Sequence, residues 1–300
     1  MRFAITGSTG LVGTELTQWL RSGGHEVTRI VRSWSGLPQG ERAIVWHPEK
    51  NAIDAQGLEG HDVVIHLAGE NIAGIWTDAK KRRIRESRAR GTRLLTSTLA
   101  ALGRPPRALI VASGFDVYGN RSPDQLIDER SAPGTGFLAD VAVASEAATQ
   151  PASDAGIRVI ITRFGNVLSP RGGMLGVLLP FFRLGLGPRF GDGHQYWPWI
   201  AVTEIAPAML HVLERPEIHG PVNLVAPEQV TNEQFTNTIA AVVGRPSFLS
   251  VPAFAAKLAP GGMAQELLLR GSRVVPRILL DTAYPFRFPQ LKPALEALLR

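Results

Sequence analysis

The glycine pattern TGSTGLVG, at residues 6–13, is the feature that most restricts how this chain can fold. Its three glycines follow the spacing G-x-x-G-x-x-G, and the pattern stands between a short apolar segment at 2–6 and an amphipathic segment at 11–24. A turn of this kind lets backbone N–H groups and a helix N-terminus approach a pyrophosphate, and a Cβ would block that approach. The pattern therefore predicts a strand, a nucleotide-binding turn and a helix.

The rest of the chain alternates between apolar strand patterns and helical patterns. The expected strands lie at 2–6, 26–32, 62–69, 108–113, 158–169 and 220–226, and the expected later helices at 78–101 and about 137–150. Strands that are apolar without interruption are typical of a parallel sheet covered by helices on both faces. We therefore expect an α/β fold: a doubly wound parallel sheet of the Rossmann type.

The alternation weakens after about Gly172, where proline, glycine and aromatic residues accumulate, and the last 55 residues look helical. This change predicts a smaller C-terminal lobe on the substrate side of the sheet. The expected bounds are 1–170 and 198–226 for the nucleotide-binding Rossmann domain, and 171–197 and 227–300 for the lobe.

Composition excludes several classes of protein. The 300 residues are 44% hydrophobic and 19% charged, as in an ordinary globular chain. There is no cysteine, and the seven histidines include no pair at metal-ligand spacing, so we expect no disulfide and no metal. No apolar run approaches the roughly twenty residues that span a bilayer, and the N-terminus enters a strand pattern at once. A cytoplasmic location without membrane contact is the resulting expectation.

The formal charge of +6 comes mostly from the run KKRRIRESRARGTR at residues 80–93. Apolar residues recur there near helical spacing, so the basic side chains occupy the solvated faces of a helix. No aromatic residues interleave to stack on bases, and we expect no nucleic-acid partner. A small-molecule partner is expected instead, in a monomer or a homodimer.

The end of the second strand bears on the choice of nucleotide. An acidic residue there would bind the free ribose hydroxyl of NAD, but the segment RIVRSWSG offers Arg32, and the first Asp or Glu after Arg32 is Glu41. An arginine at this place suits the additional phosphate of NADP. Successive side chains of a strand point to opposite faces, so Arg29 points to the other side from Arg32 and is less suited to bind that phosphate. NADP(H) is therefore the predicted cofactor, although an arginine at a strand end can also be only a surface residue.

Several longer motifs resemble a known superfamily. They are HLAGENIAGIWTDAKKRRIRESRARGTRLL, VASGFDVYG, GTGFLAD, TRFGNVLSPRGGML and the tail ELLLRGSRVVPRILLDTAYPFRFPQLKPALEALL. With the glycine pattern, they resemble the extended short-chain dehydrogenase/reductase superfamily. More closely, they resemble its epimerase-like subfamily, described as NAD-dependent epimerase/dehydratase or nucleoside-diphosphate-sugar epimerase, which carries its own small C-terminal domain. The resemblance covers nearly the whole chain.

The glycine turn and the resemblance together imply a set of cofactor-binding residues. These are Gly7, Ser8, Thr9, Gly10, Leu11, Val12, Gly13, Arg32, Leu67, Ala68, Gly69, Arg88, Ser113, Arg163, Gly165, Asn166 and Val167.

The proton-transfer groups of the superfamily are missing or displaced. Its extended members use a Ser or Thr, a Tyr, and a Lys four residues after the Tyr. Counting back from Glu146, the Tyr falls at Leu138, or by a slip of one at Phe137, and the Lys falls at Ala142. The serine position is Gly114. The catalytic candidates that remain are Ser113 and Tyr118, and the other groups that could move a proton are His66, Glu70, Asp116 and His194.

The substrate signature of the sugar-nucleotide epimerases is also altered. The corresponding segment of these enzymes resembles GDGxxxRDFIHVxDxA, and its arginine clamps a diphosphate. In this chain the segment is GDGHQYWPWIAVTEIA, which has Trp197 at the position of that arginine. Asn166 matches an asparagine that contacts substrate phosphates in the epimerases. Tyr196 and Trp197 either line an apolar pocket or pack against the C-terminal lobe. Asn166, Tyr196 and Trp197 are therefore the substrate candidates.

Two functions remain open from the sequence. One is an NADP(H)-dependent epimerase-like or reductase-like enzyme, an isomerase or oxidoreductase with a nonstandard proton-transfer site and an unknown substrate. The other is an NADP(H)-binding sensor or regulator that has lost catalysis.

Overall fold

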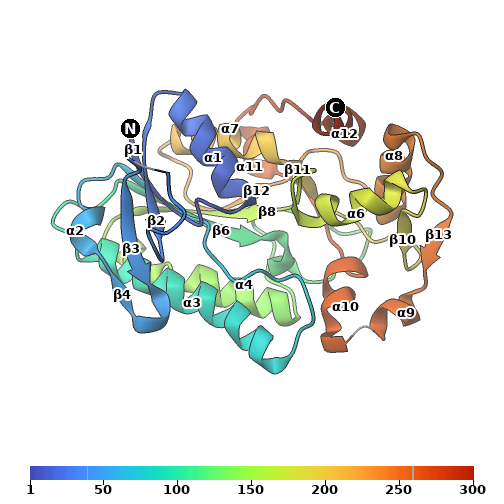
Figure 1. Cartoon of the computed structure of the whole chain (residues 1–300), viewed down its shortest axis with the longest axis horizontal. Coiled ribbons are helices and arrows are strands. Elements are labelled where there is room, and N and C mark those ends of the chain that lie inside the picture. The colour runs from blue at the N-terminus through green and yellow to red at the C-terminus, as the bar shows by residue number, and fades with distance from the viewer. Residues whose placement is uncertain (39, 259) are drawn as a thin grey trace.

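The computed structural model describes residues 1–38, 40–258 and 260–300. At its centre is an eight-stranded sheet with the order β12-β8-β6-β5-β1-β2-β3-β4 (Figure 1). The strands are β1 (Arg2–Thr6), β2 (Glu26–Val31), β3 (Ala43–His47), β4 (Ala52–Ile53), β5 (Val63–His66), β6 (Ala108–Gly114), β8 (Arg158–Phe164) and β12 (Gly220–Leu224). Every neighbouring pair is parallel except β3 with β4. The Rossmann-type sheet expected from the sequence is confirmed.

Helices cover both faces of this sheet (Figure 1). One face carries α1 (Leu11–Ser22), α7 (Val202–Leu213) and α11 (Arg277–Asp281), and the other carries α3 (Asp78–Ala100), α4 (Phe137–Ala147) and α5 (Gln150–Asp154). Leu16 and Met209 pack against the first face, whereas Leu95 and Leu99 pack against the second. Each such side chain contributes roughly 1.5–3 kcal/mol when it leaves water, so both layers are held by their apolar stripes.

The basic run forms the first half of α3. The helix begins after Thr77, whose side chain accepts a hydrogen bond from the Lys80 N–H. It buries Ile84 and exposes Arg82 and Arg85, as the helical periodicity predicts.

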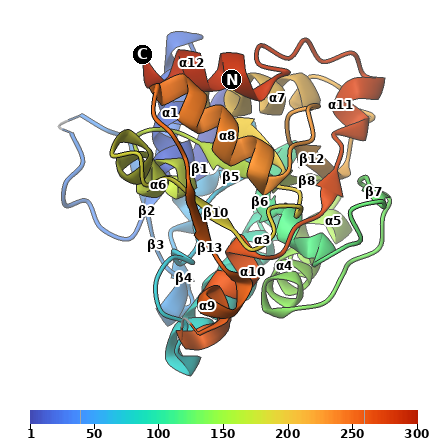
Figure 2. The same cartoon turned by 90° about the vertical axis from the view of Figure 1, so that its right-hand side faces the viewer.

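A second group of elements surrounds its own apolar core at the carboxyl end of the sheet (Figure 2). The elements that contribute side chains to this core are α6 (Gly173–Arg183), β10 (Pro188–Phe190), α8 (Asn232–Val243), β13 (Leu249–Val251), α10 (Met263–Leu268) and α12 (Leu291–Leu299). The helix α9 (Ala253–Lys257) and the 3₁₀ turn η3 (Pro260–Gly262) connect β13 to α10. Phe182, Phe235 and Leu295 are among its fully buried residues. The core also contains Leu168 and Trp199, and the exact domain bounds stay a prediction.

The structure differs from the expected elements at several places, and β3 and β4 of the main sheet were not among the expected strands. The strand expected at 158–169 is divided at Gly165, and β9 (Asn166–Leu168) pairs outside the main sheet with β11 (Trp199–Ala201). A Cβ at Gly165 would lie 2.9 Å from the carbonyl carbon of Pro198, so only glycine permits this crossing. The C-terminal 55 residues include β13 and β14 (Arg273–Val274), which pair with β10 and β7 (Leu126–Ile127). The expected helix at 137–150 ends as α4, before α5 begins.

The remaining elements are short. They are the 3₁₀ turns η1 (Pro48–Lys50) and η2 (Phe115–Tyr118), and the helix α2 (Ala55–Leu58). Of these, η2 follows β6 directly and therefore lies at the carboxyl edge of the sheet, where open α/β sheets bind their ligands.

Candidate functional site

The three glycines of the turn between β1 and α1 differ in the space that they leave for a side chain. Two of them have no room for a Cβ, and the third is exposed. A Cβ at Gly7, where φ is +65°, would lie 2.8 Å from the carbonyl carbon of Leu67, and one at Gly13 would lie 2.2 Å from the carbonyl oxygen of Gly7. A Cβ at Gly10 would meet only that oxygen, at 3.3 Å, and Gly10 is exposed. The outer two glycines are therefore required by the packing of the chain, whereas Gly10 leaves free space at the start of α1.

The loops after β1 and β5 meet beside this turn. The Thr6 hydroxyl accepts hydrogen bonds from the N–H groups of Leu67 and Ala68, at 3.0 and 3.1 Å, and forms a hydrogen bond with His66 Nδ1 at 2.7 Å. The chain crosses from one face of the sheet to the other at this pair of strands, since α1 and α3 cover opposite faces. Such a switch point forms a crevice for a dinucleotide, so the structure brings the predicted turn and the predicted segment 67–69 together.

Arg88 of α3 lies against the end of β5. Its Nη1 donates to the carbonyl oxygens of Glu70 and Ile84, at 3.0 and 3.4 Å. A Cβ at Gly69 would be 3.2 Å from Arg88 Cζ, which explains glycine at that position. Burial lowers the pKa of Arg88 from its very high ordinary value. The predicted cofactor residues Gly69 and Arg88 therefore adjoin, and Arg88 places a cation beside the crevice.

Two arginines of the β2 region have different surroundings. Arg29 donates to the Ser8 carbonyl oxygen at 2.8 Å and to a Glu41 carboxylate oxygen at 3.3 Å, so its guanidinium supports the turn from inside. A hydrogen bond from Arg21 lowers the pKa of Glu41. Arg32 lies just after β2 and is exposed. Arg32 is therefore accessible to solvent at the strand end, and its contact with a cofactor stays a prediction.

Tyr118 requires a correction, because it is 0% exposed. Its hydroxyl donates to Asn223 Oδ1 at 2.7 Å and accepts from Arg163 Nη1 at 3.0 Å. Burial raises the pKa of Tyr118 to about 12. A hydroxyl that is enclosed and engaged in this way has no route to a substrate, so Tyr118 is structural and the catalytic assignment is wrong.

Arg163 requires a second correction. The residue is 6% exposed, and its Nε and Nη2 donate to the two carboxylate oxygens of Glu146 at 3.0 and 2.7 Å. Ser113 Oγ donates to the same carboxylate at 2.7 Å. The Arg163 guanidinium is therefore occupied within the protein and does not bind the cofactor. Glu146, which the sequence offered only as a reference point for counting, joins β6, α4 and β8; no sequence spacing identifies such a contact.

The positions of the absent Tyr–Lys pair are filled with hydrocarbon. Leu138 packs with Trp76 and Val141, and Met263 and Leu267 of α10 pack onto the same cluster. Ala142 packs against Val117 and Tyr118. The face of α4 that carries the acid–base pair elsewhere in the superfamily is thus an apolar wall, and α10 closes it from outside.

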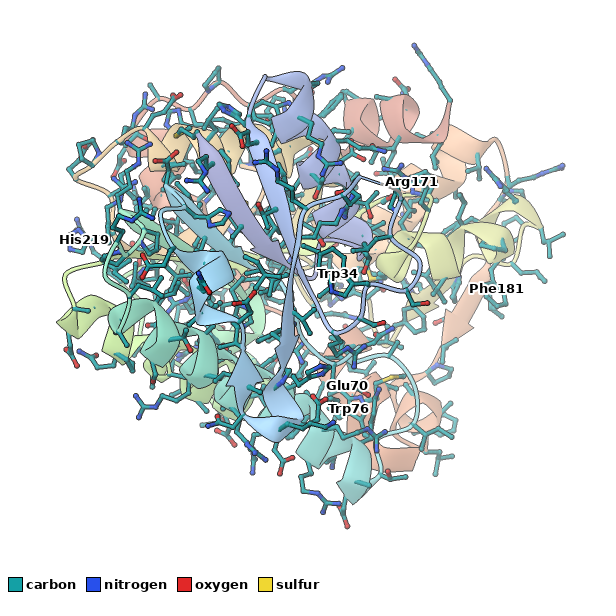
Figure 3. The ribbon with its side chains drawn as sticks, turned by 60° about the vertical axis from the view of Figure 1, so that its left-hand side comes forward. Trp34, Glu70, Trp76, Arg171, Phe181 and His219 are labelled. Atoms are coloured by element: carbon teal, nitrogen blue, oxygen red, sulfur yellow. The ribbon has the colours of Figure 1, made fainter. Side chains whose placement is uncertain are left out.

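Two of the other candidates for proton transfer, His66 and Glu70, have lowered pKa values, and a third, His194, lies on the surface. His66 is 3% exposed, and burial lowers its pKa to about 4, so the ring is neutral near pH 7. Glu70 belongs to the segment that precedes α3, as does Trp76 (both labelled in Figure 3), and a hydrogen bond from Lys80 at 2.8 Å lowers the pKa of Glu70. His194 is exposed, 3.8 Å from Asp192. The sixth candidate, Asp116, differs from these because burial raises its pKa to about 6.

The substrate candidates lie around β9 and β11. Asn166 donates from Nδ2 to the Pro198 carbonyl oxygen at 3.0 Å and is partly exposed. Arg273 stacks its guanidinium over Tyr196, 5.5 Å from the ring centre. Trp197 is 1% exposed between Phe190 and Phe235, so it packs inside the second core and does not line an open pocket. We therefore remove Trp197 from the substrate candidates.

The remaining predicted cofactor residues lie near the same crevice edge. Val12, Leu67 and Val167 all pack against the core of the first sheet face. Leu11 faces Gly172 and Gly173, since a Cβ on either glycine would lie within 3.6 Å of its side chain.

Within 1–38, 40–258 and 260–300, no three His, Asp or Glu side chains gather as a metal site would need. Among the helices of those same residues, none combines the length and apolar character needed to cross a membrane.

Comparison with known proteins gives matches over the whole length. The NAD dependent epimerase/dehydratase family matches residues 3–225, and a domain of unknown function, DUF1731, matches residues 251–298. An epimerase family protein of Mycobacterium tuberculosis is 41% identical over 97% of this chain and 95% of its own length. Epimerase family protein SDR39U1 of Homo sapiens is 34% identical over 99% of both chains. The crystal structure of human SDR39U1 (isoform2) with NADPH superposes with a TM-score of 0.90, at 36% identity and 99% coverage of both chains.

Proposed function

Because the chain belongs to the NAD dependent epimerase/dehydratase family, we propose that it binds NADP(H) in the crevice beside β1 and exchanges a hydride with a small molecule. A reduced nicotinamide supplies a hydride, and the protein supplies binding, orientation and a proton. The family membership alone does not decide the substrate, because the proton-transfer residues of the superfamily are replaced here.

One observation carries this proposal: Gly10 is the exposed glycine of the turn, and a Cβ there would meet only the Gly7 carbonyl oxygen, at 3.3 Å, whereas Cβ atoms at Gly7 and Gly13 would overlap several backbone atoms. Packing therefore requires glycine at the outer two positions, and at Gly10 the absent side chain leaves the start of α1 accessible to a ligand. The N–H groups at the start of α1 point to the same place, and Gly10 provides no side chain to cap them. Backbone donors with a helix dipole behind them suit a pyrophosphate. The NADPH in the human structure supports the same choice of ligand.

Arg32 supports NADP(H) over NAD(H). It is exposed at the end of the strand that borders the ribose side of such crevices, and Glu41, the first acidic residue after it, is engaged by Arg21 and Arg29. A guanidinium in this position forms charge-assisted hydrogen bonds to a phosphate.

Calorimetric titration with NADPH and NADH tests the cofactor assignment. We expect NADPH to bind at least about tenfold more tightly, a difference of about 1.4 kcal/mol. An Arg32→Asp variant should lose most of this preference, whereas Arg82→Asp, at an exposed arginine of α3, should keep it. Equal affinities in the parent protein would contradict the role of Arg32.

Hydride transfer is tested separately from binding. The reduced-nicotinamide absorbance is followed with the activated carbonyl compounds 2,3-butanedione and 4-nitrobenzaldehyde. Consumption of NADPH by the parent, and not by a Gly10→Val variant, is the expected result. NADPH binding without turnover on either compound would favour a sensor over an enzyme.

A further inference from the structure

The second core exposes a group of large apolar side chains at its outer edge. Leu184, which follows α6 directly, is 73% exposed, and Phe248, which precedes β13 directly, is 86% exposed. Figure 3 shows Phe181, near the end of α6, at the edge of the molecule. We call the whole group the lobe patch; its exposed members are Val177, Phe181, Leu184, Leu186, Phe248 and Leu249. Single exposed apolar residues are ordinary, but a group of this size marks an interaction site.

The lobe patch is assembled from two segments that are distant in the sequence. The strands β10 and β13 pair in parallel, with Pro188 opposite Leu249. Just before these strands, a Cβ at Gly185 would lie 3.9 Å from Pro246, so the chain after α6 runs beside the chain before β13. Figure 2 shows β10 and β13 next to each other on the face turned toward the viewer. The apolar residues of both segments are therefore neighbours on one surface.

The exposed charges within these two segments are positive. Neither the stretch from α6 to β10 nor the stretch between α8 and α9 contains Asp or Glu, whereas both Arg183 and Arg245 are exposed. From α8, Glu233 faces β10, but it is paired with Arg189 at 2.6 Å. The exposed Asp192 lies beyond the end of β10. A surface of apolar and cationic side chains complements a partner that offers hydrocarbon together with negative charge.

The exposure of the lobe patch favours a lipid surface over a folded partner. A groove that binds a peptide encloses the side chains of the peptide, whereas Leu184 and Phe248 are themselves largely surrounded by solvent. Surfaces that bind membranes insert such Leu and Phe side chains at the boundary of the headgroups, and nearby arginines attract anionic lipids. A second copy of this chain fits less well, because a two-fold interface would bring Arg183 and Arg245 close to like charges.

We propose that the lobe patch docks onto a membrane surface that contains anionic phospholipids. Leu184 and Phe248 enter the interfacial layer, and Arg183 and Arg245 contact the phosphate-bearing headgroups. Docking of this kind needs no helix that spans the bilayer. The expectation of no membrane contact was based on apolar runs in the sequence, and a surface assembled from two segments produces no such run. The proposal does not depend on the proposed hydride transfer.

Flotation with lipid vesicles tests the proposal on the whole chain. Vesicles of phosphatidylcholine with phosphatidylserine are compared with vesicles of phosphatidylcholine alone, at low and at physiological salt. We expect binding to the anionic vesicles that weakens as salt is added, because salt screens exposed charges. Leu184→Ser/Phe248→Ser should weaken this binding about tenfold or more, because both side chains lose their burial in the lipid. If the parent does not bind anionic vesicles at low salt, the inference is wrong.

Charge variants identify the basic surface that is responsible. Arg183→Glu/Arg245→Glu should weaken binding to the anionic vesicles about tenfold or more. Arg82→Glu/Arg85→Glu, at exposed arginines of α3, is the matched control and should keep most of the binding. The reverse result would assign the attraction to the basic run of α3 and would overturn the inference. All three double variants should keep the thermal transition of the parent, so that a loss of docking is separated from a loss of folding.

A fluorescent label reports the contact itself. Because the chain has no cysteine, Phe248→Cys can be labelled at a single place with an environment-sensitive dye. Val143→Cys, at an exposed valine of α4, is the matched control. Anionic vesicles should shift the emission at position 248 to shorter wavelength and leave that at position 143 unchanged; equal responses would contradict the proposal.

Sedimentation velocity without lipid tests the other occupant. We expect the parent and Leu184→Ser/Phe248→Ser to have the same oligomeric state. If the parent is instead a dimer that this double variant separates, the lobe patch is an interface between two copies and the inference is wrong.

Discussion

The carboxyl edge of the sheet contains two neighbouring regions that are shaped by different means. Around the end of β1, the region of residues 6–13 and 67–69 is shaped by backbone contacts, and a single added carbon at Gly7 or Gly13 would collide with main-chain atoms. Around the end of β6, the region of residues 113–118 with α4 is shaped by side chains. There Glu146 holds Ser113 and Arg163, and Tyr118 is enclosed by Arg163 and Asn223.

This difference indicates which of the two regions can change its chemistry when a residue is substituted. The backbone region presents the same N–H groups whatever its side chains are, so its capacity for a pyrophosphate survives most substitutions. The side-chain region changes its chemistry with each replacement. Gly114, Leu138 and Ala142 stand at the positions of the usual Ser, Tyr and Lys, so the acid–base residues are absent, yet the fold around these positions is intact.

The largest effect is expected from breaking the buried Glu146–Arg163 pair. Glu146→Ala leaves a guanidinium that is 6% exposed without its carboxylate, and removing one partner of such a pair costs about 3–5 kcal/mol. The double variant Glu146→Met/Arg163→Met should lose much less, because no charge remains buried. Chemical denaturation measures both. A loss below about 1 kcal/mol in Glu146→Ala would mean that the β6 region does not depend on this pair.

The two regions should respond to acid in opposite directions. His66, beneath the glycine turn, has a folded pKa of about 4, below its ordinary value of about 6.5. As pH falls through this window the unfolded chain binds a proton that the folded chain does not, so stability falls by on the order of 3 kcal/mol. Asp116 has a folded pKa of about 6, above its ordinary value, so its contribution is present in acid and is lost as pH rises through 6.

Denaturation of variants between about pH 4 and pH 7 separates these two contributions. His66→Gln should flatten the loss of stability on acidification, and Asp116→Asn should steepen it. Identical pH dependences of stability in the parent and both variants would contradict the expected contributions of His66 and Asp116.

A smaller effect should distinguish two glycines of the same turn. Gly13→Val should destabilise the protein by about 1–3 kcal/mol or more, since its Cβ would overlap the Gly7 carbonyl oxygen. Gly10→Val should leave the thermal transition in place and abolish cofactor binding. Gly23→Val, at the other end of α1, is the matched control and should change neither property. Unfolding of Gly10→Val would show that all three glycines are structural.

The smallest effect concerns turnover of the superfamily's usual substrates. With NADP⁺ added, we expect little or no activity on UDP-glucose or on simple alcohols, because Leu138 and Ala142 occupy the Tyr and Lys positions. The change in nicotinamide absorbance tests this in the parent and in Leu138→Tyr/Ala142→Lys. Turnover by the parent at ordinary enzyme rates, about 1–10³ s⁻¹, would contradict the interpretation of α4.

The sequence predicted those features that depend on local backbone constraints. The turn at residues 6–13, the strands β1, β2, β5, β6, β8 and β12 and the solvated face of α3 follow from glycine spacing and from apolar periodicity, whereas β3, β4 and β7 were not predicted. Tyr118 and Arg163 were misassigned because their roles depend on Asn223 and Glu146, which lie 105 and 17 residues away along the chain. The break at Gly165 was missed for the same reason, since the obstacle is Pro198.

The contact of α10 with the apolar wall of α4 bears on how the two matched segments of this chain evolve. The two matched families, at residues 3–225 and 251–298, meet at that wall, where Met263 and Leu267 lie on Leu138 and Trp76. A gene shortened after residue 225 would encode the glycine turn and α4 but would leave Leu138 and Trp76 without the side chains of α10 that cover them. Natural selection on this packed cluster therefore acts on both segments together, and substitutions in α4 and α10 should be inherited as compensating pairs.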